Sequence, residues 1–134
     1  MSSRLRMEVP AAPAAVPSAR GAVTRLCEHL GIGGELTERI RLATTEACSN
    51  CVRHAYRDED ASSTFALEAR VEDDTFVLVV RDYGRGIAAG GASRPDSLRL
   101  GLRLIDELAD SSSISSRPGR GTRVAMRFAM ASAE

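Results

Sequence analysis

The chain has 134 residues with a formal net charge of zero, and it is 43% hydrophobic and 27% charged, which suits a single globular domain over residues 1–134. Balanced charge gives no global field for nucleic acid or a membrane surface, and no apolar run is long enough to span a bilayer. All 18 basic residues are arginine, so a Walker-type phosphate loop, lysine Schiff-base chemistry and the lysine-dependent ATP site of ordinary protein kinases are excluded.

Hydrophobic patterning predicts one strand and two helices in the first part of the chain. Residues 4–9 alternate polar and apolar, as a half-buried strand does. Residues 9–19 are rich in proline and alanine and are interpreted as a loop or crossover. From Ser18 to Leu30 apolar residues recur at helical spacing, and Gly31 is expected to end that helix. A second helix is predicted from about Glu35 to Ala55.

The remainder of the chain indicates two hairpins separated by a helix. The first hairpin turns at Asp73 and Asp74, and the second turns at a Pro-Gly-Arg-Gly run. Small polar residues between the first hairpin and the helix predict a mobile loop. The predicted elements are strands 64–72 and 75–81, a loop at 88–97, a helix at 98–110, and strands 111–117 and 122–129.

This order of elements predicts an α+β fold. We expect a two-layer sandwich in which three helices lie on one face of a mixed, mostly antiparallel sheet. A single helical layer leaves the other face of the sheet partly uncovered, which suggests self-association as a homodimer.

The cysteines indicate a reducing compartment. Their number is three, which is odd, and the N-terminus lacks the apolar stretch of an export signal, so a cytoplasmic location is expected. Cys48 and Cys51 form a C-x-x-C, but no second cysteine pair or histidine pair accompanies them. We interpret them as small residues that pack the second helix, in preference to a redox or zinc site.

Two polar residues on the second helix have the chemistry of a phosphoryl-transfer site. Glu46 and Asn50 are four residues apart and therefore project from one helix face. A carboxylate can take the proton of an attacking hydroxyl, and an amide oxygen beside phosphates suits Mg²⁺. If Glu46 and Asn50 are considered without the rest of the sequence, the alternative to a catalytic role is that they belong to an ordinary polar face of a helix.

Glycine turns downstream of that helix point to a nucleotide. Asp82 ends an apolar strand and can accept a hydrogen bond from an exocyclic amine, while Gly84 and Gly86 allow the backbone to approach a ligand closely. Gly101 lies near the start of the third helix, where free N–H groups suit phosphate, and the loop before it is placed to act as a lid. The Thr122 hydroxyl is a candidate support for Asp82.

These motifs, in this order, resemble the nucleotide-binding boxes of the GHKL ATPases, which have the Bergerat fold. The sequence around Glu46 and Asn50 looks most like the anti-sigma-factor serine kinases of the RsbW type. The resemblance spans nearly the whole chain. The matching boxes are Glu46–Asn50, Asp82-x-Gly84-x-Gly86-Ile87, Gly101-Leu102 and Gly119-x-Gly121-Thr122.

The resemblance implies an ATP-binding serine kinase and anti-sigma factor. The resemblance implies that Glu46 is the catalytic base and that Asn50 holds Mg²⁺. It also implies that Asp82 accepts a hydrogen bond from the adenine amine of ATP or ADP. Family members phosphorylate a STAS-type anti-anti-sigma regulator, bind a sigma factor and usually dimerise. Arg20, on the first helix, matches a position that faces protein partners. The remaining residues implied to bind ATP are Gly84, Gly86, Ile87, Gly101, Leu102 and Thr122.

One residue departs from the family pattern. The lid commonly ends Gly-x-Gly, whereas this chain has Arg99-Leu100-Gly101. Arg99 is either a phosphate contact or a sign of a lid that closes differently, and Arg53 is a second candidate phosphate contact. The alternative function is therefore a regulator-binding module without kinase activity. A kinase that acts on a scaffold in a larger complex would carry the same motifs.

Overall fold

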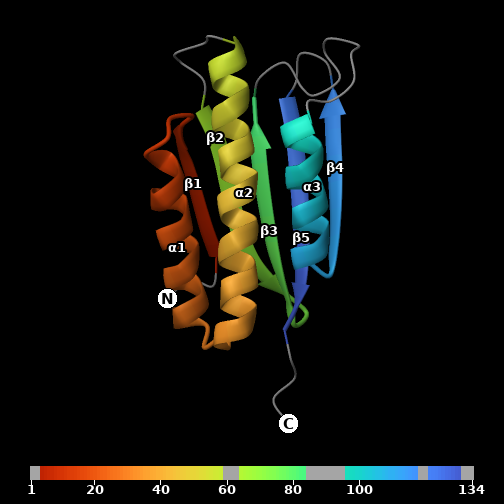
Figure 1. Ribbon diagram of the computed structural model, residues 1–134. Coiled ribbons are helices and arrows are strands. Elements are labelled where there is room, and N and C mark those ends of the chain that lie inside the picture. The colour runs from red at the N-terminus through yellow and green to blue at the C-terminus, as the bar shows by residue number, and fades with distance from the viewer. Residues whose placement is uncertain (1–3, 59–63, 84–95, 118–120, 131–134) are drawn as a thin grey trace.

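A computed structural model describes residues 4–58, 64–83, 96–117 and 121–130. Within them, the chain forms three helices and five strands in the order that the sequence predicts (Figure 1). Most of the predicted loop at 88–97 lies outside the described residues. The elements are β1 (Arg4–Pro10), α1 (Ala15–His29), α2 (Gly34–Asp58), β2 (Thr64–Glu72), β3 (Thr75–Asp82), α3 (Asp96–Leu108), β4 (Ser111–Arg117) and β5 (Gly121–Ala129).

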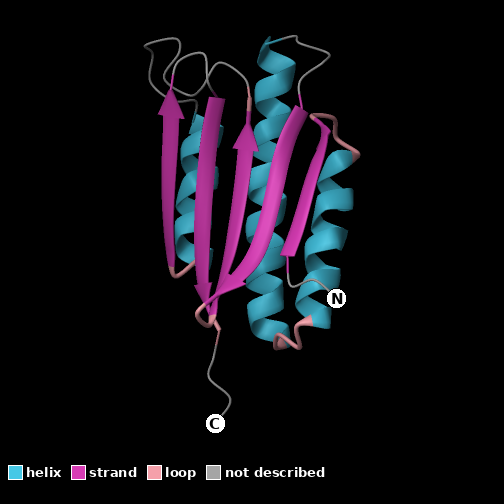
Figure 2. Cartoon of the chain, turned by 180° about the vertical axis from the view of Figure 1, so that it is seen from behind, coloured by secondary structure: helices cyan, strands magenta, loops and turns pink. Residues whose placement is uncertain are grey.

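The sheet has the strand order β1-β2-β3-β5-β4, and each of these described pairings is antiparallel. The sequence predicted a mixed, mostly antiparallel sheet. Strand β4 does run parallel to β3, because the chain crosses over through α3 between them. The two strands do not pair with each other, however, because β5 lies between them and is antiparallel to both. All three helices cover one face of the sheet, and the view from behind shows the other face open (Figures 1 and 2). The predicted α+β sandwich is confirmed.

Helix α1 begins earlier than the sequence predicts. The proline-rich segment interpreted as a loop up to residue 19 is helical from Ala15, with Pro17 in the first turn. Proline is tolerated there because the first N–H groups of a helix have no partner within the helix. The predicted stop at Gly31 is confirmed. Gly31 has φ +71°, and the N–H of Ile32 bonds back to the carbonyl of Cys27 at 3.0 Å.

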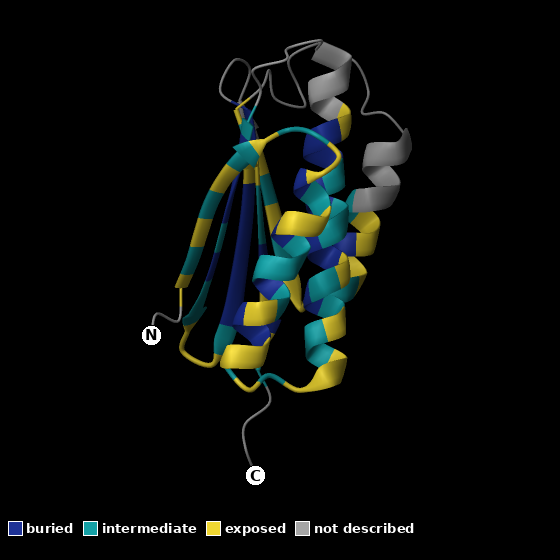
Figure 3. Ribbon diagram, turned by 90° about the vertical axis from the view of Figure 1, so that its left-hand side faces the viewer, coloured by how far each residue is buried: buried dark blue, intermediate teal, exposed yellow. Residues whose placement is uncertain are grey.

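The core lies between the helical layer and the sheet, where the buried residues gather (Figure 3). Phe76 and Phe128 are directly opposite on β3 and β5, and their rings pack edge to face with centroids 6.4 Å apart. The helices contribute mainly small side chains such as Ala43 and Ala47, which let α2 lie close to the strands. No helix among the described residues has the length and apolar character required to cross a bilayer.

The uncovered face of the sheet is charged. Val77 and Val79 lie there and are nevertheless buried. The cross-strand neighbours of Val77 are Arg70 and Arg127, whose long aliphatic stems are suited to covering it. Arg70 is held in place by an ion pair with Glu72 at 2.9 Å. The face left open by the helices is therefore polar at its surface, and the homodimer stays a prediction.

Candidate active site

One face of α2 carries three polar side chains that contact each other. Asn50 is only 9% exposed, and the side chain of Glu46, one turn earlier, is 20% exposed. Arg53 donates a hydrogen bond from Nη1 to Oδ1 of Asn50 at 2.8 Å, and the same nitrogen lies 3.6 Å from Oε1 of Glu46. The helical spacing predicted that Glu46 and Asn50 share a face. It did not predict that Arg53 contacts both of them.

Asp82 approaches this helix from the sheet. It is the last residue of β3, is half-buried, and faces Thr122 of β5 directly across the strand pair. Thr122 is 6% exposed, so the predicted pair of polar residues is placed together at a buried strand end. Asp82 alternates onto the same face of β3 as the core residues Leu78 and Val80, which is the face that the helices cover. Asp82 therefore faces the helical layer, in which α2 packs against β3.

Gly121 is required by this arrangement for a steric reason. It begins β5 with φ +88°, which L side chains rarely adopt. A Cβ at this position would lie 2.0 Å from the backbone oxygen of Asp82 and 3.0 Å from Cα of Tyr83. The sequence pointed to the Gly-x-Gly-Thr turn, and the structure shows that its second glycine lets β5 close against the Asp82 backbone.

The three cysteines are free and buried in the core. Burial raises the pKa of Cys48 to about 12 and that of Cys27 to about 11. Burial also raises the pKa of Cys51 well above its ordinary value, with smaller contributions from Asp82 and Cys48. Thiols with such high pKa values stay protonated at neutral pH and are poor nucleophiles and metal ligands. The prediction that Cys48 and Cys51 pack the helix is confirmed.

The remaining predicted ATP contacts are only partly described. Gly84, Gly86 and Ile87 lie outside the described residues. Arg99 and Gly101 belong to the first turns of α3, at the same end of the molecule as the end of β3 and the start of β5 (Figure 1).

Leu102, the next residue of α3, is half-buried and lines a cleft of about 350 Å³ between α3 and strands β4 and β5. Ile105, Ile114 and Val124 also line this cleft. Among the described residues, neither the polar face of α2 nor Asp82 contributes to it. The cleft is therefore on the other side of α3 from the predicted site.

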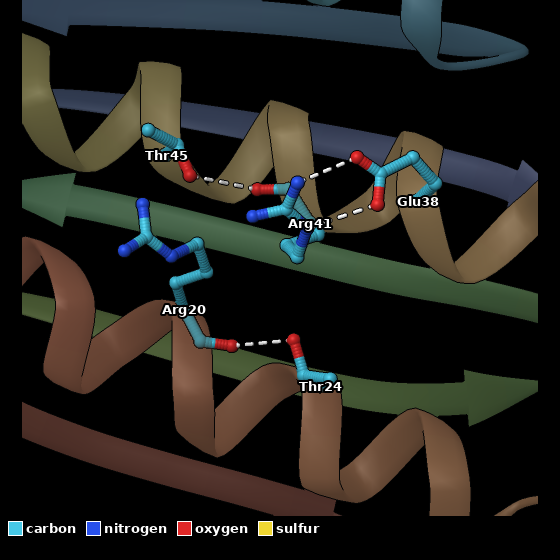
Figure 4. Close-up of polar contacts among 5 residues, drawn as sticks. All are labelled: Arg20, Thr24, Glu38, Arg41 and Thr45. Carbon is cyan, nitrogen blue, oxygen red and sulfur yellow. Dashed lines mark hydrogen bonds and ion pairs between the residues drawn. The ribbon is translucent and has the colours of Figure 1, made fainter.

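Arg20 lies away from these residues on α1. Its backbone carbonyl accepts a hydrogen bond from Thr24 at 2.8 Å, and its side chain extends in the direction of α2, which carries Arg41 and Thr45 (Figure 4). Arg41 is engaged by Glu38 at 2.6 Å. Arg20, in contrast, makes no ion pair with any residue that the structure describes.

Comparison with known proteins agrees with the fold. Residues 9–128 match the family described as the histidine kinase-like ATPase domain. Serine-protein kinase RsbW of Bacillus velezensis is 28% identical over 128 residues, which cover 86% of this chain and 79% of the relative. Anti-sigma F factor of Oceanobacillus iheyensis is 32% identical over 101 residues, which cover 69% of this chain and 68% of the relative. With RsbW of Bacillus subtilis, 31% identical, the match spans 49% of the relative.

Solved structures share the fold. The RsbU and RsbW domains of a Mycobacterium tuberculosis protein superpose with a TM-score of 0.75 at 20% identity, over 95% of this chain and 32% of that one. The SiaB–SiaC complex from Pseudomonas aeruginosa gives a TM-score of 0.76 at 11% identity, over 92% of this chain and 88% of that one.

The matched region, the helical layer over an antiparallel sheet and the polar face of α2 define the class of this protein. The chain belongs to the histidine kinase-like ATPase domain family. Within that family it is of the RsbW type, together with the serine-protein kinases and anti-sigma factors described above.

Proposed function

We propose that this protein is an anti-sigma factor with serine kinase activity, and that it transfers the γ-phosphoryl group of Mg-ATP to a serine of a STAS-type anti-anti-sigma regulator. The observation that carries the proposal is the position of Glu46 and Asn50 on one face of α2, the helix that packs against β3, the strand that ends in Asp82. Its relatives of the RsbW type support the same activity.

In the proposed reaction Glu46 accepts the proton of the serine hydroxyl as its oxygen attacks the γ-phosphorus. A new P–O bond to the serine forms, the bond between the γ-phosphorus and the β–γ bridging oxygen breaks, and ADP leaves. Asp82 accepts a hydrogen bond from the adenine amine and holds the nucleotide in place, with Thr122 opposite it.

The donor set of α2 fits Mg²⁺. Asn50 offers a neutral amide oxygen and Glu46 a carboxylate one turn away, and Mg²⁺ prefers a few oxygen ligands together with phosphates and water. In the proposal Asn50 holds the ion. An ion held there would supply positive charge to offset the charge that develops on the phosphates.

Arg20, which has no ion-pair partner among the described residues, is proposed to contact the regulator or the sigma factor. A homodimer is proposed as the working assembly. ATP and sigma factors are cytoplasmic molecules, so this function requires a cytoplasmic location.

The test of this function is transfer of labelled phosphate from Mg-ATP to a purified STAS-type anti-anti-sigma regulator. We expect label on one serine of the regulator and none when that serine is replaced by alanine. The alternative, a regulator-binding module without kinase activity, is motivated by Arg99 in the lid sequence. Tight binding of the regulator without transfer of label would favour that alternative and overturn the kinase proposal.

Asp82→Asn is expected to weaken ATP binding by more than tenfold, which corresponds to ~1.4 kcal/mol or more. An amide keeps the size of the carboxylate but removes the charge that strengthens the hydrogen bond to the adenine amine. Calorimetric titration with ATP measures the effect, and Asp74→Asn, in the tight turn at the other end of β3, is the control. Unchanged affinity in Asp82→Asn would mean that the adenine lies elsewhere.

A further inference from the structure

We propose that Arg53 is a switch in the nucleotide site. Without nucleotide, its guanidinium is hydrogen-bonded to the Asn50 oxygen that would bind Mg²⁺, and binding of Mg-ATP displaces the guanidinium from that oxygen. The inference rests on the proposed function, since it assigns a positioning role within the same site. Nη1 of Arg53 donates to Oδ1 of Asn50 at 2.8 Å, and this oxygen is the atom with which Asn50 would hold the ion.

The two cations compete for that oxygen. Mg²⁺ binds oxygen ligands at about 2.0–2.1 Å, and Nη1 of Arg53 is 2.8 Å from the same atom. If Mg²⁺ and Nη1 of Arg53 contacted this amide oxygen at the same time, they would lie at most about 4.9 Å apart. Repulsion at that distance favours one occupant at a time. Arg53 must therefore leave Asn50 when the ion arrives.

Arg53 also restrains the proposed base. The same nitrogen lies 3.6 Å from Oε1 of Glu46, so one guanidinium bridges both working residues of α2. Asn50 and Glu46 are largely shielded from solvent, whereas the side chain of Arg53 is 48% exposed and has room to move outward. Once displaced, its planar fork suits the phosphates of the incoming nucleotide. Displacement thus frees both residues in one step.

The experiment compares the affinity for the non-hydrolysable β,γ-imido analogue of ATP with Mg²⁺ and with a chelator. The ratio of the two affinities measures the enhancement by Mg²⁺. We expect Arg53→Gln to raise this ratio by ~5-fold or more, because ~1 kcal/mol is typical of a hydrogen bond that the ion no longer has to break. Arg41→Gln, which removes an exposed arginine on the same helix, is the matched control and should leave the ratio unchanged.

A second background separates the switch from a simple phosphate contact. In Asn50→Ala the oxygen for which the cations compete is gone, so Arg53→Gln should no longer change the enhancement by Mg²⁺. An equal change in both backgrounds, or no change in either, would overturn the switch. If the unaltered protein binds the analogue under neither condition, the proposed function itself fails, and that outcome is distinct from the others.

Discussion

Replacing Glu46 with glutamine is expected to reduce phosphoryl transfer to the regulator by ~10²–10⁴-fold. Glutamine keeps the shape of the side chain and its position on α2, but it cannot accept the proton of the attacking serine. Nucleotide affinity should change little, because the assigned role is in the chemical step. Single-turnover transfer of labelled phosphate, with saturating Mg-ATP and regulator, measures the loss.

Glu38→Gln is the matched control for this experiment. Glu38 lies two turns earlier on the same helix and is paired with Arg41 at the surface (Figure 4). Its replacement should leave the rate of transfer unchanged. If Glu46→Gln bound Mg-ATP normally and transferred phosphate at the rate of the unaltered protein, Glu46 would not be the base.

Gly121→Ala is expected to destabilise the fold by ~3 kcal/mol, which lowers Tm by ~10 °C, and to weaken ATP binding. The new Cβ would lie 2.0 Å from the backbone oxygen of Asp82. In addition, the backbone angle φ +88° is strained for alanine even if space were made for the Cβ. Relief of the clash must move β5 or the end of β3, and either shift displaces Asp82. Thermal unfolding followed by circular dichroism, with calorimetric titration of ATP, measures both effects.

Gly33→Ala controls for the loss of a glycine. Gly33 precedes α2, has no positive φ, and has open space where a Cβ would lie. Its replacement should leave stability within ~0.5 kcal/mol or raise it slightly. Equal stability of the two variants would show that the close approach of Gly121 to Asp82 is not required for the fold.

Local patterns predicted most of the fold. Alternation and helical spacing are direct consequences of burying one face of each element, so the order and type of the elements followed from them. Asp73 and Asp74 both have positive φ, as the two-residue hairpin turn requires. The start of α1 was missed because prolines were interpreted as loop signals, although Pro17 occupies a first turn that tolerates it.

The candidate site was predictable as a set of residues and much less so as a set of contacts. The spacing of Glu46 and Asn50 places them on one face, and a spacing of three adds Arg53 to it. Which oxygen the guanidinium contacts depends on side-chain conformation, which no pattern encodes. The placement of Asp82 relative to the polar face of α2 depends on how α2 packs against β3, a long-range relation that neither segment carries alone.

The most direct test of the central claim is calorimetric titration of the purified protein with ATP, with and without Mg²⁺. The site formed by Asn50 of α2 and Asp82 of β3 predicts saturable binding that Mg²⁺ strengthens. A folded protein that binds no ATP at millimolar concentration would contradict the nucleotide site and leave a regulator-binding module in its place.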